Sequence, residues 1–268
     1  MIHYRKNNLT VFQSALYQTT SAIIESEEAM IVTDPTWLPQ EIEEIKQYIN
    51  ERIGRRQLYI IYTHSDFDHI IGTGAFPEAK VIASEAFKNN TRKEEIIKEI
   101  YEFDQEYYIE RDYEINYPTV DRVIKEDGEK LELGEMTLTF YKAPGHTDDG
   151  LFTVIEPYGI FLSGDYLSDV EFPFIESSYY DYVETVNKAR WLQAHHDIKV
   201  HVPGHGNVTE EEIELTDRLK FSEGYLIRLK EEDLSLVKEL IERFTFFEGM
   251  KDSHTDNLTR VKEEGKEG

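Results

Sequence analysis

Residues 57–69 read Q-L-Y-I-I-Y-T-H-S-D-F-D-H, an apolar run of strand length followed at once by side chains that can ligate metals. A continuous run of this kind is typical of a strand buried on both faces, so we expect its carboxyl end to deliver His64 into a loop. Four ligand-type residues then stand at i, i+2, i+4 and i+5, a spacing that packing alone does not explain: His64, Asp66, Asp68 and His69.

Three later motifs place further ligand-type residues after expected strands. They are E-M-T-L-T-F-Y-K-A-P-G-H (135–146), Y-G-I-F-L-S-G-D (158–165) and I-K-V-H-V-P-G-H-G (198–206), which supply His146, Asp165 and His205. One such turn alone is more often structural, but a site for two divalent cations needs about six or more nitrogen and oxygen ligands. Glycine beside a ligand lets the backbone approach closely, and proline fixes the turn. Together the four motifs predict a metal site formed by loops at strand ends.

The composition restricts both the ligands and the partners. The 268 residues contain no cysteine, so any metal must be held by imidazole and carboxylate groups. With 54 acidic and 29 basic residues, the formal net charge of −25 would repel phosphates, so we expect no nucleic-acid partner. No stretch approaches about 18 apolar residues and no signal-like run opens the sequence, so we expect a cytoplasmic protein with a small-molecule substrate and no membrane partner. Nothing in the sequence indicates an oligomeric state.

The order of apolar runs predicts a doubled, β-rich architecture. Two or three short strands are expected within residues 9–34, including 11–17, and Pro39 opens a helix that ends near Gly54. Strand patterns return between 135 and 202, and helices are expected from about 209 onward. Because strands followed by a helix occur in each half, the pattern favours two packed sheets with helices outside them. We find no linker-like composition and interpret residues 1–268 as one domain.

These motifs resemble those of the metallo-β-lactamase superfamily, which includes glyoxalase II-like thioesterases, lactonases, phosphodiesterases and flavodiiron proteins. The resemblance runs from about Ser21 to Gly206. It implies an α+β fold, a four-layer αβ/βα sandwich in which two mixed β-sheets pack face to face with helices outside, and a dinuclear metal site at one edge. By motif position it implies His64, Asp66 and His146 as ligands of the first metal, Asp68, His69 and His205 as ligands of the second, and Asp165 as the bridge. It also matches Asp34 to an aspartate that supports the metal loop from behind.

Asp66 departs from the usual pattern of the family. Most members have histidine at this position, whereas flavodiiron proteins have a carboxylate and bind iron. The resemblance favours two zinc ions, but a hard, negative carboxylate shifts the preference toward iron or manganese. Aspartate is also shorter than histidine, so both a dinuclear and a single-metal site stay open.

The expected chemistry follows from such a site. Two cations roughly 3.5–4 Å apart would make a bridging hydroxide available as nucleophile and polarise the oxygen of the scissile group. We therefore expect a hydrolase that cleaves an ester-type bond, whether carboxylic ester, lactone, thioester or phosphoester. Asp68 is interpreted first as a ligand and second as the catalytic group that orients or deprotonates the water. The alternative is a diiron redox or oxygen-binding protein, disfavoured because these residues include no flavodoxin-like domain.

A segment between the first two motifs is a candidate cap insertion, at about 85–118. Its part from 99 to 118 contains seven acidic residues, six aromatic residues and a single basic one, Arg111. An ordinary amphipathic helix with a solvated acidic face explains this composition. The alternative is a cap that selects a cationic substrate, since aromatic rings beside carboxylates suit quaternary ammonium groups.

The remaining histidines and both tryptophans are expected to be structural. We expect a solvated helix end at His195 and His196, core packing at His201, surface positions at His3 and His254, and packing roles for Trp37 and Trp191. In the family, however, a C-terminal helix often begins with the H-x-x-N pattern that spans His254 to Asn257 here.

Overall fold

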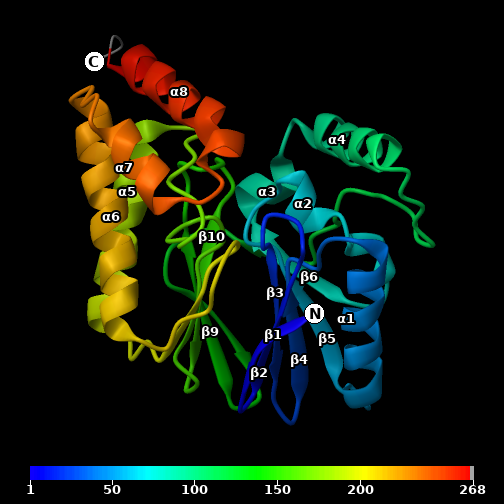
Figure 1. Cartoon of the computed structure of the whole chain (residues 1–268). Helices are drawn as coiled ribbons and strands as arrows, with labels where there is room; N and C mark the ends of the chain where they lie inside the picture. The colour runs from blue at the N-terminus through cyan, green and yellow to red at the C-terminus, as the bar shows by residue number, and fades with distance from the viewer. Residues whose placement is uncertain (266–268) are drawn as a thin grey trace.

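The computed structural model describes residues 1–265, and in it two β-sheets pack face to face with helices on both outer sides (Figure 1). Both sheets are mixed, one with seven strands and the other with five. Three layers of buried apolar side chains separate the four layers of secondary structure, one between the sheets and one under each set of helices. The expected α+β, four-layer αβ/βα sandwich is therefore confirmed.

The first sheet has its strands in sequence order. They are β1 (Ile2–Lys6), β2 (Leu9–Gln13), β3 (Thr20–Glu25), β4 (Ala29–Thr33), β5 (Gln57–Ile61), β6 (Lys80–Ser84) and β7 (Arg122–Ile124). The strands are antiparallel up to β4 and parallel from β4 to β7. The strand expected over 11–17 ends at Gln13, because the Ser14 hydroxyl accepts a hydrogen bond from the backbone N–H of Leu16 and turns the chain out of the sheet.

The second sheet has the order β12-β11-β10-β9-β8. Its strands are β8 (Glu129–Leu133), β9 (Met136–Lys142), β10 (Leu151–Glu156), β11 (Ile160–Leu162) and β12 (Val200–Val202). All neighbours are antiparallel except β11 and β12. The motif residues His146, Asp165 and His205 follow β9, β11 and β12 and lie close together, as the sequence predicts.

The helices follow from sequence signals that are simple to trace. On the side of the first sheet are α1 (Pro39–Arg52), α2 (Phe67–Ile70), the 3₁₀ turn Thr73–Ala75, α3 (Glu85–Asn89) and α4 (Lys93–Glu106). On the side of the second are α5 (Tyr179–His195), α6 (Glu212–Lys230), α7 (Leu236–Arg243) and α8 (Phe247–Glu264). Pro39 opens α1 and Gly54, with φ +58°, follows its end, as expected. No helix within residues 1–265 is long and apolar enough to cross a lipid bilayer.

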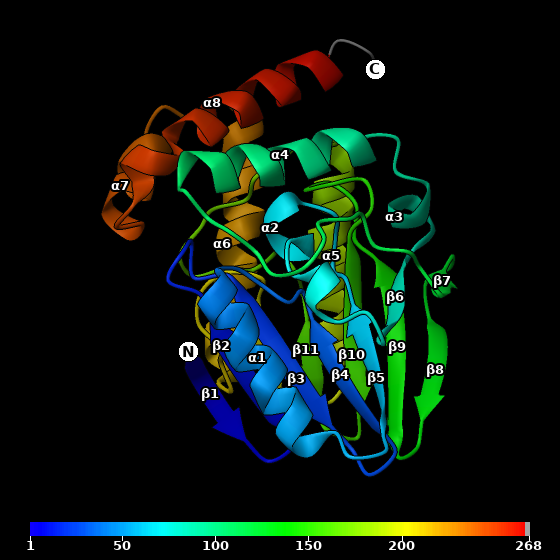
Figure 2. The same cartoon turned by 90° about the vertical axis from the view of Figure 1, so that its right-hand side faces the viewer.

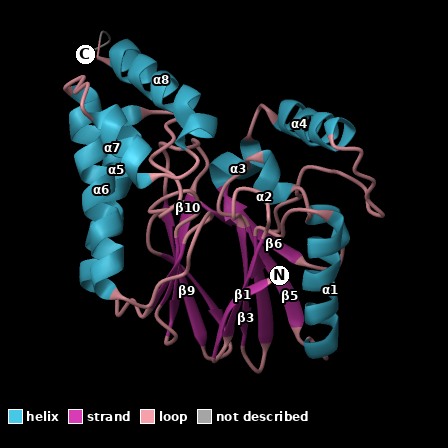
Figure 3. Cartoon of the chain, viewed as in Figure 1, coloured by secondary structure: helices cyan, strands magenta, loops and turns pink. Residues whose placement is uncertain are grey.

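Two helices flank the edge of the sandwich where the motifs gather. Figures 1 and 2 place α4 and α8 above this edge, α4 on the side of the first sheet and α8 on the side of the second. Apart from the short helices α2 and α3, the chain beneath them is irregular, as the pink loops in Figure 3 show. The rigid sheets thus hold the strand ends in place, while the long loops and the two helices surround the space above them.

Candidate metal centre

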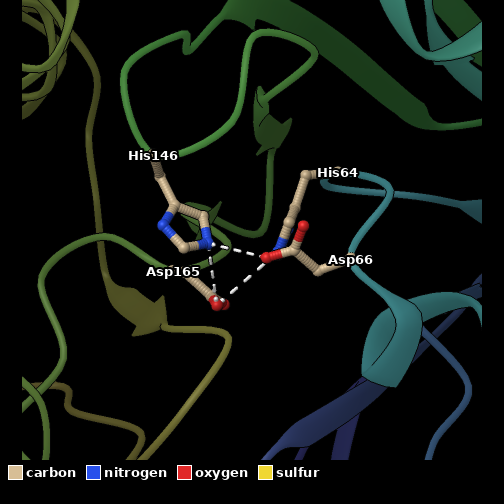
Figure 4. A group of neighbouring side chains, drawn as sticks. All are labelled: His64, Asp66, His146 and Asp165. Atoms are coloured by element: carbon tan, nitrogen blue, oxygen red, sulfur yellow. Dashed lines mark hydrogen bonds and ion pairs between the residues drawn. The ribbon is translucent and has the colours of Figure 1, made fainter. Parts of the chain in front are cut away.

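Four motif side chains converge from three loops, as Figure 4 shows. The Nε2 atom of His146 lies 3.1 Å from Oδ2 of Asp66 and 3.3 Å from Oδ2 of Asp165. The Nε2 atom of His64 lies 3.5 Å from both of these carboxylate oxygens. One ligand atom from each of the four residues fits within 4.8 Å of the others, which is close enough to surround one cation.

A second group lies beside the first, and Asp165 contacts both. Its members Asp68, His69 and His205 also offer ligand atoms within 4.8 Å of one another. The Nε2 atoms of His69 and His205 are 3.3 Å apart, and both face the Asp68 carboxylate, at 3.4 and 3.5 Å. Asp165 reaches them with Oδ1 at 3.1 Å from His69 and Oδ2 at 3.2 Å from His205. The structure thus brings together all seven predicted ligands in the two groups that the resemblance implies.

The Nδ1 atoms of the four imidazoles face away from this centre and each has a partner. His146 and His205 donate from Nδ1 to the carbonyl oxygens of Phe174 and Tyr17, at 2.8 and 2.9 Å. Nδ1 of His69 lies 3.1 Å from the Asp34 carboxylate, and Nδ1 of His64 lies 3.0 Å from the Thr63 hydroxyl. Partners of this kind fix the ring and its tautomer, which leaves Nε2 free to ligate.

Asp34 links the two central strands of the first sheet beneath the centre. Its carboxylate accepts hydrogen bonds from the Thr63 backbone N–H at 2.9 Å and the Thr63 hydroxyl at 2.6 Å. The same group faces His69, so the ends of β4 and β5 and one candidate ligand share a single buried carboxylate. This is the supporting position that the resemblance implies for Asp34.

The chemistry of the donor set fits divalent cations. Nε2 of His64 is buried without a hydrogen-bond partner, which is costly unless a ligand satisfies it. Burial lowers the pKa of His205, but the Asp165 and Glu171 carboxylates outweigh burial and raise it to about 10. Burial and His69 likewise lower the pKa of His64, yet the Asp165 and Asp66 carboxylates raise it to about 9. The carboxylates therefore attract positive charge strongly, as ligands of divalent metals do.

Glu171 is a candidate functional residue that the sequence motifs did not reveal. It forms a third group of possible ligand atoms with Asp165 and His205, and its Oε1 lies 3.7 Å from Nδ1 of His205. Its side chain is only 12% exposed. The one sequence feature that points to Glu171 is its position, between two apolar residues and six positions after Asp165.

Asp149 is a second residue that the sequence motifs did not reveal. It joins three loops around the centre. Its buried carboxylate accepts hydrogen bonds from the Ser65 backbone N–H at 3.3 Å, the Thr147 hydroxyl at 2.8 Å and the Asn90 amide at 3.3 Å. These contacts tie the loop of the first motif to the loop of His146 and to the segment before α4. Asp149 is thus placed to fix the relative positions of two groups of candidate ligands.

Replacing Asp149 with alanine is expected to destabilise the protein by about 2–3 kcal/mol, because three buried donors lose a charged acceptor. The measurement is the free energy of urea unfolding. Asp148→Asn is the matched control, since the neighbouring side chain is exposed and should change stability by less than about 0.5 kcal/mol. Equal stability of the two variants would contradict the role of Asp149 in holding the three loops together.

For the other histidines and the tryptophans, the structure confirms some of the expected positions and contradicts others. His195 ends α5 with His196 as its cap, His3 is exposed, and the buried His201 pairs through Nε2 with the Ser163 hydroxyl at 2.8 Å. The surface position expected for His254 is wrong, because His254 is 6% exposed and its Nδ1 lies 3.0 Å from the Tyr225 hydroxyl. Trp37 is buried as expected, whereas Trp191 is 47% exposed and stacks on His195.

A cavity of about 590 Å³ opens directly onto the centre and is lined by Asp66, Asp68, His146, Asp165 and His205, among others. From the segment 85–118 it is lined by Asn90, Thr91, Arg92, Ile96 and Glu99. The 99–118 part therefore contributes Glu99 alone. Arg111 of that part holds the Asp104 carboxylate with two bonds of 2.8 Å and donates to the carbonyl oxygen of Trp37. A role of this segment as a cap stays a prediction.

Solved structures with the same fold span several named activities. A metallo-β-lactamase from Pontibacter korlensis is 16% identical, with 83% of this chain and 98% of that chain covered and a TM-score of 0.60. ETHE1 from Myxococcus xanthus is 17% identical, with 80% and 82% covered and a TM-score of 0.55. Rubredoxin oxygen:oxidoreductase from Desulfovibrio gigas is 14% identical, with 85% and 62% covered and a TM-score of 0.58. At these identities the likeness shows the fold alone.

The sequence comparison is more specific. No curated protein sequence matches the chain. The family model described as the metallo-β-lactamase superfamily matches residues 15–220, a stretch that contains all four motifs and every candidate ligand. This match covers well over half of the chain, and the chain therefore belongs to the metallo-β-lactamase superfamily.

Proposed function

We propose that the protein is a metal-dependent hydrolase that cleaves an ester-type bond of a small molecule. The observation that carries the proposal is a pair of neighbouring histidine–aspartate groups, both in contact with Asp165, beside a cavity of about 590 Å³. A cavity of this size suits a small-molecule substrate. The scissile bond is a carboxylic ester, a lactone, a thioester or a phosphoester.

The ligand assignment is part of the proposal. His64, Asp66 and His146 would hold one cation, and Asp68, His69 and His205 the other, with Asp165 between them. When bound, divalent metals at such a site supply an acidified water as nucleophile and a Lewis acid for the scissile group's oxygen. Zinc is the expected metal, with iron or manganese as alternatives because Asp66 replaces the usual histidine.

The protein's own groups hold the candidate ligands in position. The Asp68 carboxylate, within 3.5 Å of two imidazoles, is a candidate ligand first and a candidate proton acceptor second. Asp34 holds His69 in orientation, and the carbonyl oxygens of Phe174 and Tyr17 do the same for His146 and His205. Because these partners are buried or part of the backbone, the ligands are arranged before any substrate arrives.

The test is elemental analysis of the purified protein together with a panel of chromogenic esters, lactones, thioesters and phosphodiesters, assayed with zinc, manganese and iron. We expect close to two metal ions per chain and hydrolysis of one bond class. Removal of metal by a chelator should abolish hydrolysis and lower the midpoint of thermal unfolding by several degrees, about 2–4 °C for each kcal/mol lost. A protein that keeps its rate and its melting temperature in excess chelator would refute the proposal.

A second candidate is a diiron redox or oxygen-binding protein, favoured by one observation. Asp66 presents its carboxylate inside the first ligand group, 3.1 Å from His146, where most family members have an imidazole. A visible spectrum under air and after reduction separates the two functions. Bound iron with a reversible spectral change, and no hydrolysis of any panel compound, would favour the redox alternative.

A further inference from the structure

Three carboxylates around the cavity lie outside the seven ligands of the proposed chemistry, although one of them, that of Glu171, lies 3.7 Å from Nδ1 of His205. Asp148, Glu171 and Glu176 all line it, and none belongs to the seven motif ligands. Within residues 1–265 no lysine or arginine nitrogen lies within 4.0 Å of these three carboxylates. The other acid of the wall is different, because Glu99 faces Arg92 at 3.9 Å.

The charge of the cavity stays negative when the metals are included. Seven carboxylates and one guanidinium, that of Arg92, line it. Two divalent cations and Arg92 together would offset five of these negative charges and leave a formal charge of −2. The positive charge of Arg92 is also shared with Glu95, which lies 2.9 Å away. An uncharged or anionic substrate would leave this excess unbalanced next to the reacting group.

Aromatic rings lie beside the same space. Trp37, Phe67 and Tyr17 line the cavity and pack together, with ring centroids 5.4 and 5.5 Å from that of Trp37. Phe174 lines it too, on the same loop as Glu171 and Glu176. Aromatic rings and carboxylates around one cavity form the combination that recognises organic cations.

The loop that carries Glu171, Phe174 and Glu176 is held from behind by α8. The Asn257 side chain donates to the carbonyl oxygen of Pro173 at 2.6 Å and accepts from the backbone N–H of Ile175 at 2.8 Å. Asn257 is 1% exposed, and it also donates to the Tyr225 hydroxyl at 2.8 Å. These buried bonds fix the backbone of the loop, so the positions from which its carboxylates project are defined.

We propose that the substrate carries an organic ammonium group, which binds among Asp148, Glu171, Glu176 and the aromatic rings that line the same cavity, while the scissile bond faces the metal centre. This inference rests on the proposed hydrolase function and adds the substrate class. It differs from the cap hypothesis in its residues, because the selecting carboxylates lie at 148 and 171–176 rather than in 99–118.

The kinetic test compares acetylcholine with its uncharged carbon isostere, 3,3-dimethylbutyl acetate, on the metal-loaded protein. We expect kcat/KM to be about tenfold or more higher for the cation. In Asp148→Asn/Glu176→Gln the ratio of the two values should fall about fivefold, since each exposed carboxylate contributes modestly. Glu102→Gln is the matched control: Glu102 is one turn from Glu99 on α4, does not line the cavity and pairs with Lys98. In Glu102→Gln the ratio of the two kcat/KM values should equal that of the wild type.

A binding test separates failure of this inference from failure of the proposed function. Calorimetric titration of the metal-loaded protein with choline, and with uncharged 3,3-dimethylbutan-1-ol, needs no hydrolysis. We expect choline to bind about tenfold more tightly, and the preference to weaken in Asp148→Asn/Glu176→Gln and in Glu171→Gln. If neither ester is cleaved but choline is still preferred, ester hydrolysis fails and the cation site stands. Equal affinity for the two compounds, or no binding of choline, overturns the inference.

Discussion

Replacing Asp165 with asparagine should remove metal and hydrolysis together. The Asp165 carboxylate lies within 3.5 Å of four imidazole nitrogens, those of His64, His69, His146 and His205. An amide of the same shape keeps the volume but loses the charge and one of two equivalent oxygens, so neither ligand group is complete. We expect the metal content to fall from about two ions to less than one, and kcat/KM to fall roughly 10³-fold.

The control for this variant is Asp197→Asn, which alters an aspartate with an 81% exposed side chain on the surface. Metal content is measured by elemental analysis and rate with the best compound of the panel. Circular dichroism of Asp165→Asn should show the wild-type secondary structure, because the sheets do not depend on this side chain. Full metal content and a wild-type rate in Asp165→Asn would show that the shared carboxylate is not a ligand.

Gly145→Ala is expected to destabilise the protein strongly, although it adds a single methyl group. Gly145 precedes His146 with φ +125°, and an added Cβ would lie 2.3 Å from Cα and 2.4 Å from the backbone nitrogen of Tyr182. Backbone atoms of α5 cannot move aside without shifting the whole helix. We expect a loss of about 3 kcal/mol or more in the free energy of unfolding, combined from the strained φ and the steric overlap. His146 would move as well, so the metal content should also fall.

Gly128→Ala separates the two causes. Gly128 has φ +81°, but a Cβ there meets no atom within 4 Å. It should therefore lose only about 1 kcal/mol through backbone strain and keep its metals. Urea unfolding of both variants measures the difference. If Gly145→Ala is no less stable than Gly128→Ala, the contact with Tyr182 is not the reason for glycine at this position.

Much of the centre was predictable because local sequence encodes it. The run before His64 is apolar enough to be a buried strand, and a strand end fixes where the next side chains point. The glycines beside His146, Asp165 and His205 all have positive φ or close backbone contacts, which is why the motifs are short and recognisable. The fold followed from this pattern together with the family resemblance.

The parts that escaped prediction depend on contacts between distant segments. Asp149 is one acid among many until Ser65 and Asn90 are seen to donate to it. His254 looks terminal and therefore solvated, yet α8 packs over α6 and buries it against Tyr225. Glu171 lies in an irregular loop, for which neither the helical nor the strand period offers a guide. The role of such residues becomes visible only when the tertiary structure brings their partners into contact with them.

The candidate ligands come from both sheets, and this arrangement has a consequence for folding kinetics. His64, Asp66, Asp68 and His69 follow β5 of the first sheet, whereas His146, Asp165 and His205 follow strands of the second. In the proposed site neither half of the sandwich holds a complete ligand group alone, so a metal would bind fully only after the halves have docked. A bound metal would then connect the two sheets, and the sheets would separate only after a ligand is released. We expect metal to slow unfolding far more than it speeds folding.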